Sequence, residues 1–412
     1  MTGADQQTAA LLDRTRVRLV GVRPASEVVR FRSSLHLLHA GPPLRVEEAP
    51  GPMRGAIVGA LVFEGVAGGL EESTHMVERG EVELTPCHAC GGVGAMAGIV
   101  TPSMPVVVVE TDAGGRAFSP LNEGLGRALR FGSNDPDVLG RLAWIRDVAA
   151  PLLDAAIAAS DPIDLTALQA EGLRRGDECH NRNLASSAGL VLRLAPAICR
   201  AASEGAIAAQ VIEYASRNPH FFLPFSMAAA KAIGDAAAGV AGSGIVTGIC
   251  ANGWRVGVRV SGTGDRWFEA EAPLGVPCLF EGYTLEDAQP MMGDSFATEV
   301  VGLGAFALTA APAITRFIGG DAASSARLVE EMRAITVTES TRFRIPFENF
   351  RGTPLGIDVR RVAATGIAPV VNNGIAHREP GRGQVGAGVT RMPLAPFVEA
   401  AAAIDRRRSA GA

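Results

Sequence analysis

The strongest fold signal lies in the segment Pro86-Cys-His-Ala-Cys-Gly-Gly-Val-Gly-Ala-Met-Ala-Gly98, which is soon followed by Met104-Pro-Val-Val-Val-Val-Glu110. Every position of Val106–Val109 is apolar, which predicts a strand buried on both of its faces. The glycines before this strand let the backbone approach a ligand closely and turn its N–H groups toward an anion. Cys87 and His88 precede them. The segment is therefore either a reactive site beside an anion cradle or a turn with a buried thiol and a satisfied imidazole.

Two regions of the chain alternate between short apolar runs and glycine or proline. Runs such as Val17–Val22 predict strands and short helices over residues 1–134. Asn252-Gly253 stands between two alternating apolar segments, which is a strong β-hairpin signal. This hairpin opens a second α/β region over residues 242–412.

The middle of the chain, residues 135–241, has helical spacing of its apolar residues. Asp135-Pro136 supplies an N-cap and a first-turn proline, and Pro151 is expected to interrupt the helix that follows. Further helices are predicted near residues 164–175 and over residues 177–201. The predicted fold is α+β and multidomain, with two α/β regions flanking a central helical domain.

The composition is that of a folded protein without a charged binding field. The chain has 412 residues, 47% hydrophobic and 20% charged, with a net charge of −5. Two or three domains are expected at this length, and nucleic acid is a poor partner for such a charge. We find no signal peptide and no apolar stretch long enough to span a membrane. We expect a cytoplasmic protein whose six cysteines are reduced thiols.

The spacing of the cysteines only half matches a zinc site. Cys87 and Cys90 have the spacing of half a zinc site, and Cys179-His180 could complete it. The second pair is adjacent rather than spaced, so we expect no zinc. A thioredoxin-like redox pair is also disfavoured, because a glycine-rich loop and not a helix follows Cys90. No metal ligand is assigned.

Polar residues gather at Asp177-Glu-Cys-His180-Asn-Arg-Asn183, at the start of a predicted helix. Asp177 and His180 would share one face of that helix, so the carboxylate could orient the imidazole for acid–base chemistry. The alternative is a helix cap in which Asp177 binds free N–H groups and the rest is solvated. We favour a catalytic role for both residues, with Asn183 nearby to bind substrate.

Three further polar groups interrupt apolar sequence. They contain Arg266, the segment Met292-Gly-Asp294-Ser295, and Asn372-Asn-Gly-Ile-Ala-His377. Each could be an ordinary loop, but together they supply a guanidinium, carboxylates, amides and an imidazole where α/β sites are usually built. Gly302-Leu-Gly304 lacks the rest of a dinucleotide fingerprint and no P-loop is present, so no cofactor is expected.

These motifs as a set resemble the YlbE-like family, long classed as a domain of unknown function, over nearly the whole chain. The resemblance rests on His39-Ala-Gly-Pro-Pro43, Gly51-Pro-Met-Arg-Gly55, Pro86-Cys-His88, Val93-Gly94 with Met96, Leu121-Asn-Glu-Gly124, Arg130-Phe-Gly132, Gly176-Asp-Glu178 with His180 and Arg182-Asn183, Arg259-Val-Ser-Gly262, Arg266-Trp-Phe268, Met292-Gly-Asp-Ser295 and Gly374-Ile-Ala-His377. It does not extend to Cys90 or Cys179.

The resemblance implies an α+β fold and a subunit of the oxamate carbamoyltransferase of anaerobic allantoin degradation, an activity of purine catabolism. That enzyme interconverts oxamate plus carbamoyl phosphate and oxalurate plus phosphate, or acts on a related ureido acid. The implied partners are an acyl-CoA-synthetase-like subunit and a further small subunit, in a multisubunit oligomer.

The resemblance names no catalytic residues, so the roles are our own assignments. His180 is the first candidate base, with His88 and His377 next. The backbone at Gly91, Gly92 and Gly94 is the candidate anion cradle. Arg266 is the candidate carboxylate clamp, with Asn183, Asp294 and Asn373 as further substrate contacts.

Two other functions stay open. The chain could be a non-catalytic scaffold or ligand-binding subunit of the acyl-CoA-synthetase-like assembly. It could also be an amidohydrolase with Cys87 as nucleophile and a histidine base. If the chain is catalytic, we expect the loop at 87–98, the segment 177–183 and the His377 loop to converge on one cleft.

Overall fold

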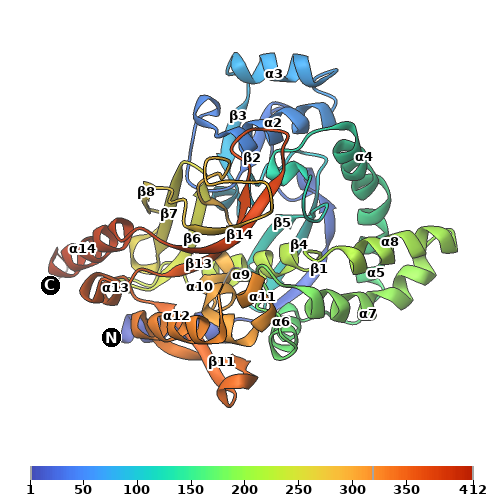
Figure 1. Cartoon of the computed structure of the whole chain (residues 1–412). Helices are drawn as coiled ribbons and strands as arrows, with labels where there is room; N and C mark the ends of the chain where they lie inside the picture. The colour runs from blue at the N-terminus through green and yellow to red at the C-terminus, as the bar shows by residue number, and fades with distance from the viewer. Residues whose placement is uncertain (1, 318–319, 411–412) are drawn as a thin grey trace.

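The computed structural model describes residues 2–317 and 320–410, and it mixes helices with several small sheets (Figure 1). This arrangement confirms the predicted α+β class. The helices are α1 (Gly3–Arg14), α2 (Gly51–Phe63), α3 (Leu70–Glu78), α4 (Pro136–Trp144), α5 (Ala150–Ala158), α6 (Leu165–Arg174), α7 (Leu184–Ala201), α8 (Gly205–Arg217), α9 (Leu223–Ala236), α10 (Ala297–Val300), α11 (Pro312–Phe317), α12 (Ala322–Ile335), α13 (Val359–Thr365) and α14 (Ala395–Ala410).

The strand predicted at Val106–Val109 lies at the centre of the first sheet. This sheet has the order β1 (Val17–Pro24), β4 (Pro105–Thr111), β5 (Arg116–Pro120), and both pairings are antiparallel. All four valines of β4 are at most 5% exposed, because Val107 and Val109 pack in one core with α9 and Val106 and Val108 pack in another core on the opposite face. The burial prediction for this strand is confirmed. Its neighbour in sequence, β3 (Glu83–Pro86), pairs in parallel with β2 (His36–His39).

The predicted hairpin is confirmed and belongs to a second sheet. β6 (Val246–Asn252) and β7 (Arg255–Val260) are antiparallel, in the order β10 (Met292–Gly293), β6, β7, β8 (Trp267–Glu271). Gly253 makes the turn with φ +84°, a conformation that favours glycine. A side chain there would meet Met292 Cε at 2.5 Å, so the turn also needs glycine for space.

Two small sheets complete the chain. β13 (Val370–Ala376), β14 (Gln384–Arg391) and β9 (Val276–Leu279) form an antiparallel sheet in the order β13-β14-β9. β11 (Thr336–Ile345) pairs with β12 (Arg351–Ile357). β13 passes close to α10 and the turn that follows it, so it brings the residues near 372 into the middle of the molecule.

The elements between residues 135 and 241 are all helices in the part of the chain that the structure describes, as predicted. Figure 1 shows α4, α5, α7 and α8 gathered at one side of the molecule, while α12, α13 and α14 lie at the other. Asp135 caps α4, and a π-helical turn at Ile145–Ala149 separates it from α5, where Pro151 lies in the first turn. The predicted interruption at Pro151 is therefore confirmed.

α7 begins at Leu184 and not at residue 177, which corrects the predicted helix. Cys179 has φ +62°, and its N–H donates to Arg182 O at 3.1 Å, so the chain turns sharply over residues 177–183. Within the described chain, α7 is the one helix whose length and composition would allow it to cross a membrane. It packs against α5 and α8 and buries Leu190, Leu194 and Ile198.

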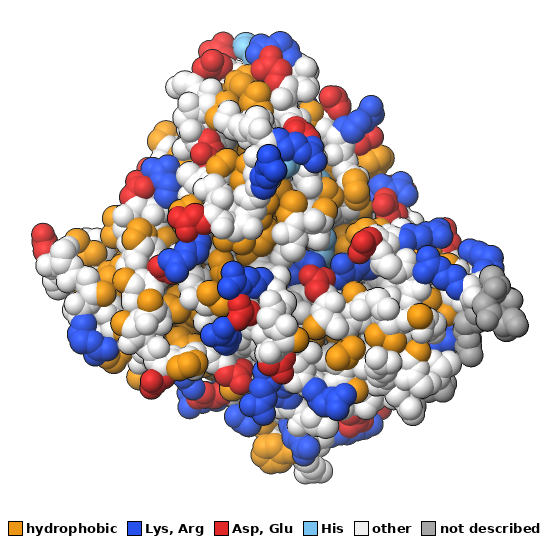
Figure 2. Space-filling model, turned by 180° about the vertical axis from the view of Figure 1, so that it is seen from behind, with side chains coloured by type: hydrophobic (Ala, Val, Ile, Leu, Met, Phe, Trp, Pro, Cys, Tyr) orange, Lys and Arg blue, Asp and Glu red, His pale blue; other side chains and the backbone are white. Residues whose placement is uncertain are grey.

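The largest hydrophobic core includes residues from Leu12 to Ile404, so it draws on all three predicted regions. A second core is built mostly from residues 25–142, joined by Met292 and Ala376. The domain boundaries near 134 and 241 stay predictions. Figure 2 shows side chains of both charge signs interspersed over one face, in keeping with the small net charge.

Candidate functional site

Two clusters of buried polar side chains lie on either side of the short segment 292–300. We call them the Asp294 cluster, built from the buried His88, Lys231, Cys250, Arg259 and Asp294 with the partly exposed Asp235, and the His180 cluster, built from Glu178, His180, Asn183, Glu299 and Asn372. The two are linked because Phe296 packs edge-on against the His180 ring, with centroids 5.9 Å apart. Segment 292–300 therefore carries one carboxylate into each cluster.

Asp294 joins this segment to the glycine-rich loop. Its two carboxylate oxygens accept hydrogen bonds from Gly41 N at 2.8 Å and Gly94 N at 2.9 Å, and its own N–H donates to Gly94 O at 2.8 Å. A Cβ on Gly94 would lie 2.4 Å from Gly98 Cα, so this close turn requires glycine. Burial raises the pKa of Asp294 to about 7, although these hydrogen bonds and Lys231 act in the opposite direction.

The glycine-rich loop does not offer the anion cradle that we predicted. The N–H groups of Gly91 and Gly92 donate to Cys87 O, and that of Gly94 donates to Asp294. Each of the three predicted donors already has a protein acceptor, because the loop folds back on itself as a 3₁₀ turn over Cys87–Cys90. These three backbone N–H groups are therefore not free to hold an anion.

His88 is a buried, neutral imidazole at the edge of the Asp294 cluster. Its Nε2 lies 3.6 Å from Asp294 Oδ1, and its ring packs edge-on against Trp267 with centroids 4.9 Å apart. Neither ring nitrogen makes a hydrogen bond to any residue that the structure describes. Burial lowers the pKa of His88 well below its usual range, and the charges of Lys231 and Arg259 lower it further.

Lys231 on α9 and Arg259 on β7 are buried cations in the same cluster. Both side chains form ion pairs with the carboxylate of Asp235, which lies one helical turn after Lys231. The exposed fraction of the Lys231 side chain is 3%. The shared carboxylate carries one negative charge against two positive charges, so it compensates the buried cations only in part.

Cys87 lies in the 3₁₀ turn and is a buried thiol. It is 0% exposed, and its Sγ lies 3.4 Å from Gly98 O. Burial raises the pKa of Cys87 well above its usual range, with Asp294 adding to the effect. A cysteine nucleophile needs a lowered pKa and an accessible sulfur, so the geometry does not favour the amidohydrolase hypothesis.

The His180 cluster has an oriented imidazole at its centre. His180 Nδ1 lies 2.9 Å from Glu299 Oε1, and the exposed fraction of the His180 residue is 2%. Nothing in the described part of the chain hydrogen-bonds the opposite nitrogen, Nε2. Burial acts to lower the pKa of His180, but the charge and hydrogen bond of Glu299, with Glu178, raise it overall.

Glu299 and Glu178 are held by backbone donors. Glu299 also accepts hydrogen bonds from Asn372 N at 2.9 Å and Ala305 N at 3.1 Å. Glu178 accepts from the N–H groups of His180 at 3.0 Å and Arg182 at 2.6 Å. Burial raises the pKa of Glu178 to about 7, against the lowering effect of His180. The cluster thus contains an imidazole whose pKa is raised and a carboxyl whose pKa is about 7, so this carboxyl can exchange protons near neutral pH.

Asp177 does not orient His180, which corrects our prediction. Its Oδ2 accepts hydrogen bonds from Ser186 N at 2.7 Å and Ser186 Oγ at 2.9 Å, so it caps the start of α7. Residues 177–183 turn instead of forming a helix, so Asp177 and His180 do not share a face. Glu299 takes the orienting position. Asn183 remains close, because its Nδ2 donates to His180 O at 2.7 Å.

The amide side chains of Asn372 and Asn373 are buried without partners. Both residues are at most 1% exposed, and no described residue hydrogen-bonds their Oδ1 or Nδ2 atoms. Buried amides of this kind are rare in finished cores and are typical of ligand sites. The hydrogen bond between Asn372 N and Glu299 brings the backbone of β13 to the His180 cluster.

Arg266 and His377 lie outside these clusters. Arg266 is exposed, and its guanidinium lies over the Phe268 ring at 4.4 Å. His377 Nε2 lies 3.3 Å from Asp287 Oδ1, and its ring packs against Tyr283. Four residues of β13, 373–376, lie between Asn372 and His377, so the Cα atoms of these two residues are roughly 17 Å apart. The predicted convergence therefore joins the 87–98 loop to segment 177–183 through segment 292–300, without the His377 loop.

Arg130 is the buried guanidinium that sequence reasoning passed over. It donates to Gly124 O at 2.8 Å and approaches His220 Nδ1 at 3.1 Å, and no described residue binds its Nε. Burial lowers the pKa of Arg130 to about 10, which leaves it charged at neutral pH. It lines a cavity of about 30 Å³ together with Ala95 and Gly98 of the glycine-rich loop.

Some of the cluster residues that we did not predict could have been recognised from the sequence. Glu299 is the one acidic residue in the apolar run between residues 296 and 312, where a carboxylate has no reason to be buried without a partner. Arg130, Glu178 and Arg259 lay within the family motifs. Lys231 and Cys250 had no local signal, because only the folding of distant segments brings them to His88.

Comparison with known proteins agrees with this architecture. Residues 82–295 match the family model described as oxamate carbamoyltransferase subunit AllG. The chain is 45% identical over 418 residues to the Escherichia coli K12 protein named oxamate carbamoyltransferase subunit AllG, covering 100% of both chains. It is 39% identical over 401 residues to the uncharacterized protein YahG of the same strain, covering 97% of this chain and 85% of YahG.

A solved structure shares the whole fold. It is the crystal structure of a conserved protein of unknown function from Enterococcus faecalis V583, with a TM-score of 0.95 and 41% sequence identity. The match covers 98% of this chain and 97% of that chain. The fold is therefore that of the whole relative and not of one shared domain.

Proposed function

Since this chain belongs to the oxamate carbamoyltransferase subunit AllG family, we propose that it carries the acid–base residues of an oxamate carbamoyltransferase. The chain is a subunit of such an enzyme by its family. The finer proposal is that catalysis takes place in the His180 cluster, with phosphorolysis of oxalurate as the useful direction. We also propose the acyl-CoA-synthetase-like subunit and the further small subunit as partners, the breakdown of allantoin as the pathway, and the cytoplasm as the location.

The chemistry needs a base and charge stabilisation. In the synthetic direction the amide nitrogen of oxamate forms a bond to the carbamoyl carbon of carbamoyl phosphate. The bond from that carbon to the phosphate oxygen breaks, and phosphate leaves. An amide nitrogen is a poor nucleophile, so a base must take its proton as the new bond forms. In phosphorolysis the same group returns a proton to the nitrogen of the departing oxamate.

The observation that carries the proposal is the hydrogen bond between His180 Nδ1 and Glu299. A carboxylate on Nδ1 keeps the proton on that nitrogen, so Nε2 has a free lone pair and can accept a proton. Nε2 has no hydrogen-bond partner in the described part of the chain, and the ring is buried. His180 is thus oriented and unused, as a general base should be.

Neighbouring groups match the substrate's amide and anionic parts. Asn372 has an unbonded amide group that suits a ureido or oxamate amide, whereas Asn373 projects from the opposite face of β13. Arg130 is a buried guanidinium that suits a carboxylate or phosphate, and it replaces Arg266 in our assignment. The cavity beside it, about 30 Å³, has room for roughly two water molecules. Substrate binding therefore requires the glycine-rich loop or a neighbouring segment to open.

The experiment that tests the function is an assay of phosphate-dependent cleavage of oxalurate. The purified chain would be measured alone and with its candidate partner subunits, with ureidoglycolate as a matched ureido acid. We expect carbamoyl phosphate and oxamate in equal amounts, at least when the partners are present. No cleavage of oxalurate by the complete assembly would refute the carbamoyl-transfer function.

A further inference from the structure

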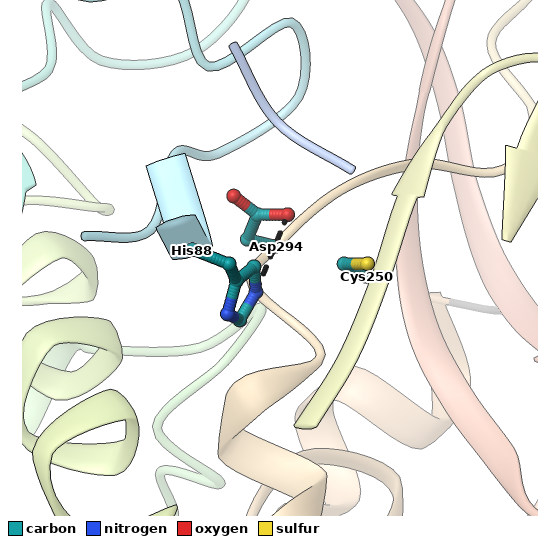
Figure 3. Close-up of side chains that lie close together, drawn as sticks. All are labelled: His88, Cys250 and Asp294. Carbon is teal, nitrogen blue, oxygen red and sulfur yellow. Dashed lines mark ion pairs between the residues drawn. The ribbon is translucent and has the colours of Figure 1, made fainter. Parts of the chain in front are cut away.

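The Asp294 cluster contains three metal-ligating side chains from distant parts of the chain. His88 comes from the 3₁₀ turn, Cys250 from β6, and Asp294 from the segment after β10 (Figure 3). One ligand atom of each lies within 4.8 Å of the other two, and all three residues are buried. The role of His180 as general base does not explain why these three side chains lie together.

His88 supplies an independent sign that the cluster holds a ligand. Both of its ring nitrogens lack a hydrogen bond within the described residues, although the side chain is only 3% exposed. Figure 3 shows the ring beside Asp294 and Cys250, with Nε2 facing the carboxylate at 3.6 Å. A buried imidazole with two unused nitrogens is rarely left unsatisfied in a core.

The carboxylate is held in a way that suits a metal ligand. The N–H groups of Gly41 and Gly94 each bind one oxygen of Asp294, which fixes the carboxylate and leaves each oxygen a second lone pair. Outer hydrogen bonds of this kind orient ligands in metal sites. The close packing of Gly94 on Gly98 then fixes the backbone that supplies one of these donors.

We propose that His88, Cys250 and Asp294 bind one divalent transition-metal ion, with zinc as the best match. Imidazole, thiolate and carboxylate are all zinc ligands, with bonds of about 2.0–2.3 Å, which place tetrahedral ligand atoms roughly 3.3–3.8 Å apart. The His88–Asp294 separation of 3.6 Å already lies in this range, and the other two separations, each at most 4.8 Å, need to shorten by up to about 1 Å. Three protein ligands leave one position for water or a substrate oxygen.

The charges around the three ligands favour a metal ion whose fourth ligand is an anion. Lys231 and Arg259 are both paired with Asp235, so their charge is partly compensated before a metal binds. Together with the ion they would favour a negatively charged group at the open position. The site differs from the Cys87–Cys90 half-site of the sequence analysis, because Cys87 Sγ faces Gly98 O and the third ligand is Cys250.

The test is metal binding by the purified chain without substrate, so it stands apart from the carbamoyl-transfer assay. The apo protein would be titrated with Co²⁺, which occupies zinc sites and gives a thiolate-to-cobalt absorption band when sulfur is a ligand. Zn²⁺ content would be measured in parallel by elemental analysis. We expect one ion per chain and a band whose intensity corresponds to one thiolate.

Matched variants locate the ligands. Cys250→Ser should abolish the band and His88→Gln should weaken Co²⁺ binding at least tenfold. Cys90→Ser, which changes a thiol outside the cluster in the same turn as His88, should leave both unchanged. Circular dichroism and thermal melting would establish that each variant is folded, and the wild-type spectrum tests the proposal even if a variant does not fold. Wild-type protein without bound metal or without the band, or a band that survives in Cys250→Ser, would overturn the site.

Discussion

The hydrogen bond between His180 and Glu299 is the contact on which the proposed chemistry depends most. The carboxylate raises the pKa of the imidazole against the opposing effect of burial and also sets its tautomer. In Glu299→Gln the pKa of His180 should fall, so the acid limb of the pH–rate profile should move to lower pH, with kcat reduced about a hundredfold. Steady-state kinetics across pH on the assembled enzyme would measure both effects. An unchanged profile would exclude Glu299 from the mechanism.

Glu178 should make folding stability depend on pH. Its pKa is about 7 in the folded chain and about 4.5 when unfolded, so between these values the folded state holds one more proton. The free energy of unfolding should therefore fall as pH rises through this window, by up to about 1.4 kcal/mol per pH unit from this group. His180 adds to the fall at higher pH, because its pKa is also raised in the folded state.

Glu178→Gln isolates this contribution. The substitution removes a titrating group, so the variant should lose less stability than the wild type between about pH 5 and about pH 7.5, a range that covers most of the interval between the unfolded and folded pKa of Glu178. Urea unfolding at the two pH values would give the difference. If the free energy of unfolding fell equally with pH in both proteins, the pKa of Glu178 would not be raised in the folded chain.

At the start of α7, the structure distinguishes two roles that the sequence allowed for Asp177, namely capping the helix and orienting His180. Asp177 accepts hydrogen bonds from Ser186 N and Oγ and makes no bond to His180. Asp177→Ala should lower the free energy of unfolding by about 1 kcal/mol, the usual value of an N-cap, while turnover per folded molecule stays unchanged. Thermal melting and kinetics on the same preparation would test this. A loss of kcat without a loss of stability would return Asp177 to the site.

The glycine-rich loop is a second element, and its role is to hold Asp294 through the N–H group of Gly94. Gly94→Ala places a Cβ 2.4 Å from Gly98 Cα, so the loop must move away from Asp294. We expect destabilisation of about 2 kcal/mol or more. Gly140→Ala in α4 is the matched control, because no atom lies within 4 Å of its Cβ, and it should be neutral or stabilising. Equal melting temperatures for both variants would contradict this account of the loop.

Much of the element pattern could be predicted because it follows from local sequence. The strand at Val106–Val109, the turn at Asn252-Gly253 and the break near Pro151 each depend on a few adjacent residues. The start of α7 could not, because a left-handed Cys179 and the side-chain bonds of Glu178 replace the expected helical turn. Those bonds form only when the segment meets the rest of the fold.

At the scale of the whole molecule, the candidate site depends on contacts between residues far apart in sequence. His180 meets Glu299, and His88 meets Cys250 and Asp294, only through the placement of β6 and β13 around segment 292–300. The sequence identified the histidines and Asp294 by their polar setting. It could not pair them, because pairing is set by tertiary packing and not by spacing.

The same packing predicts how the six thiols react. Cys199 and Cys278 are exposed, Cys90 is intermediate, and Cys87, Cys179 and Cys250 are buried. A thiol reagent should modify the first two rapidly, Cys90 slowly, and the last three only after unfolding. Mass spectrometry after timed labelling would show the order. Rapid modification of Cys87 in the folded protein, above all by a substrate-like electrophile, would revive the amidohydrolase hypothesis.

The most direct test of the central claim is the turnover of the assembled enzyme with His180→Gln in this chain, beside Asp177→Asn as the control from the same segment. If His180 is the base, phosphate-dependent oxalurate cleavage should fall about a hundredfold or more in kcat, with KM nearly unchanged and the subunits still assembled. Asp177→Asn should retain wild-type turnover. Full activity in the folded, assembled His180→Gln enzyme would contradict the account and place the base in a partner subunit.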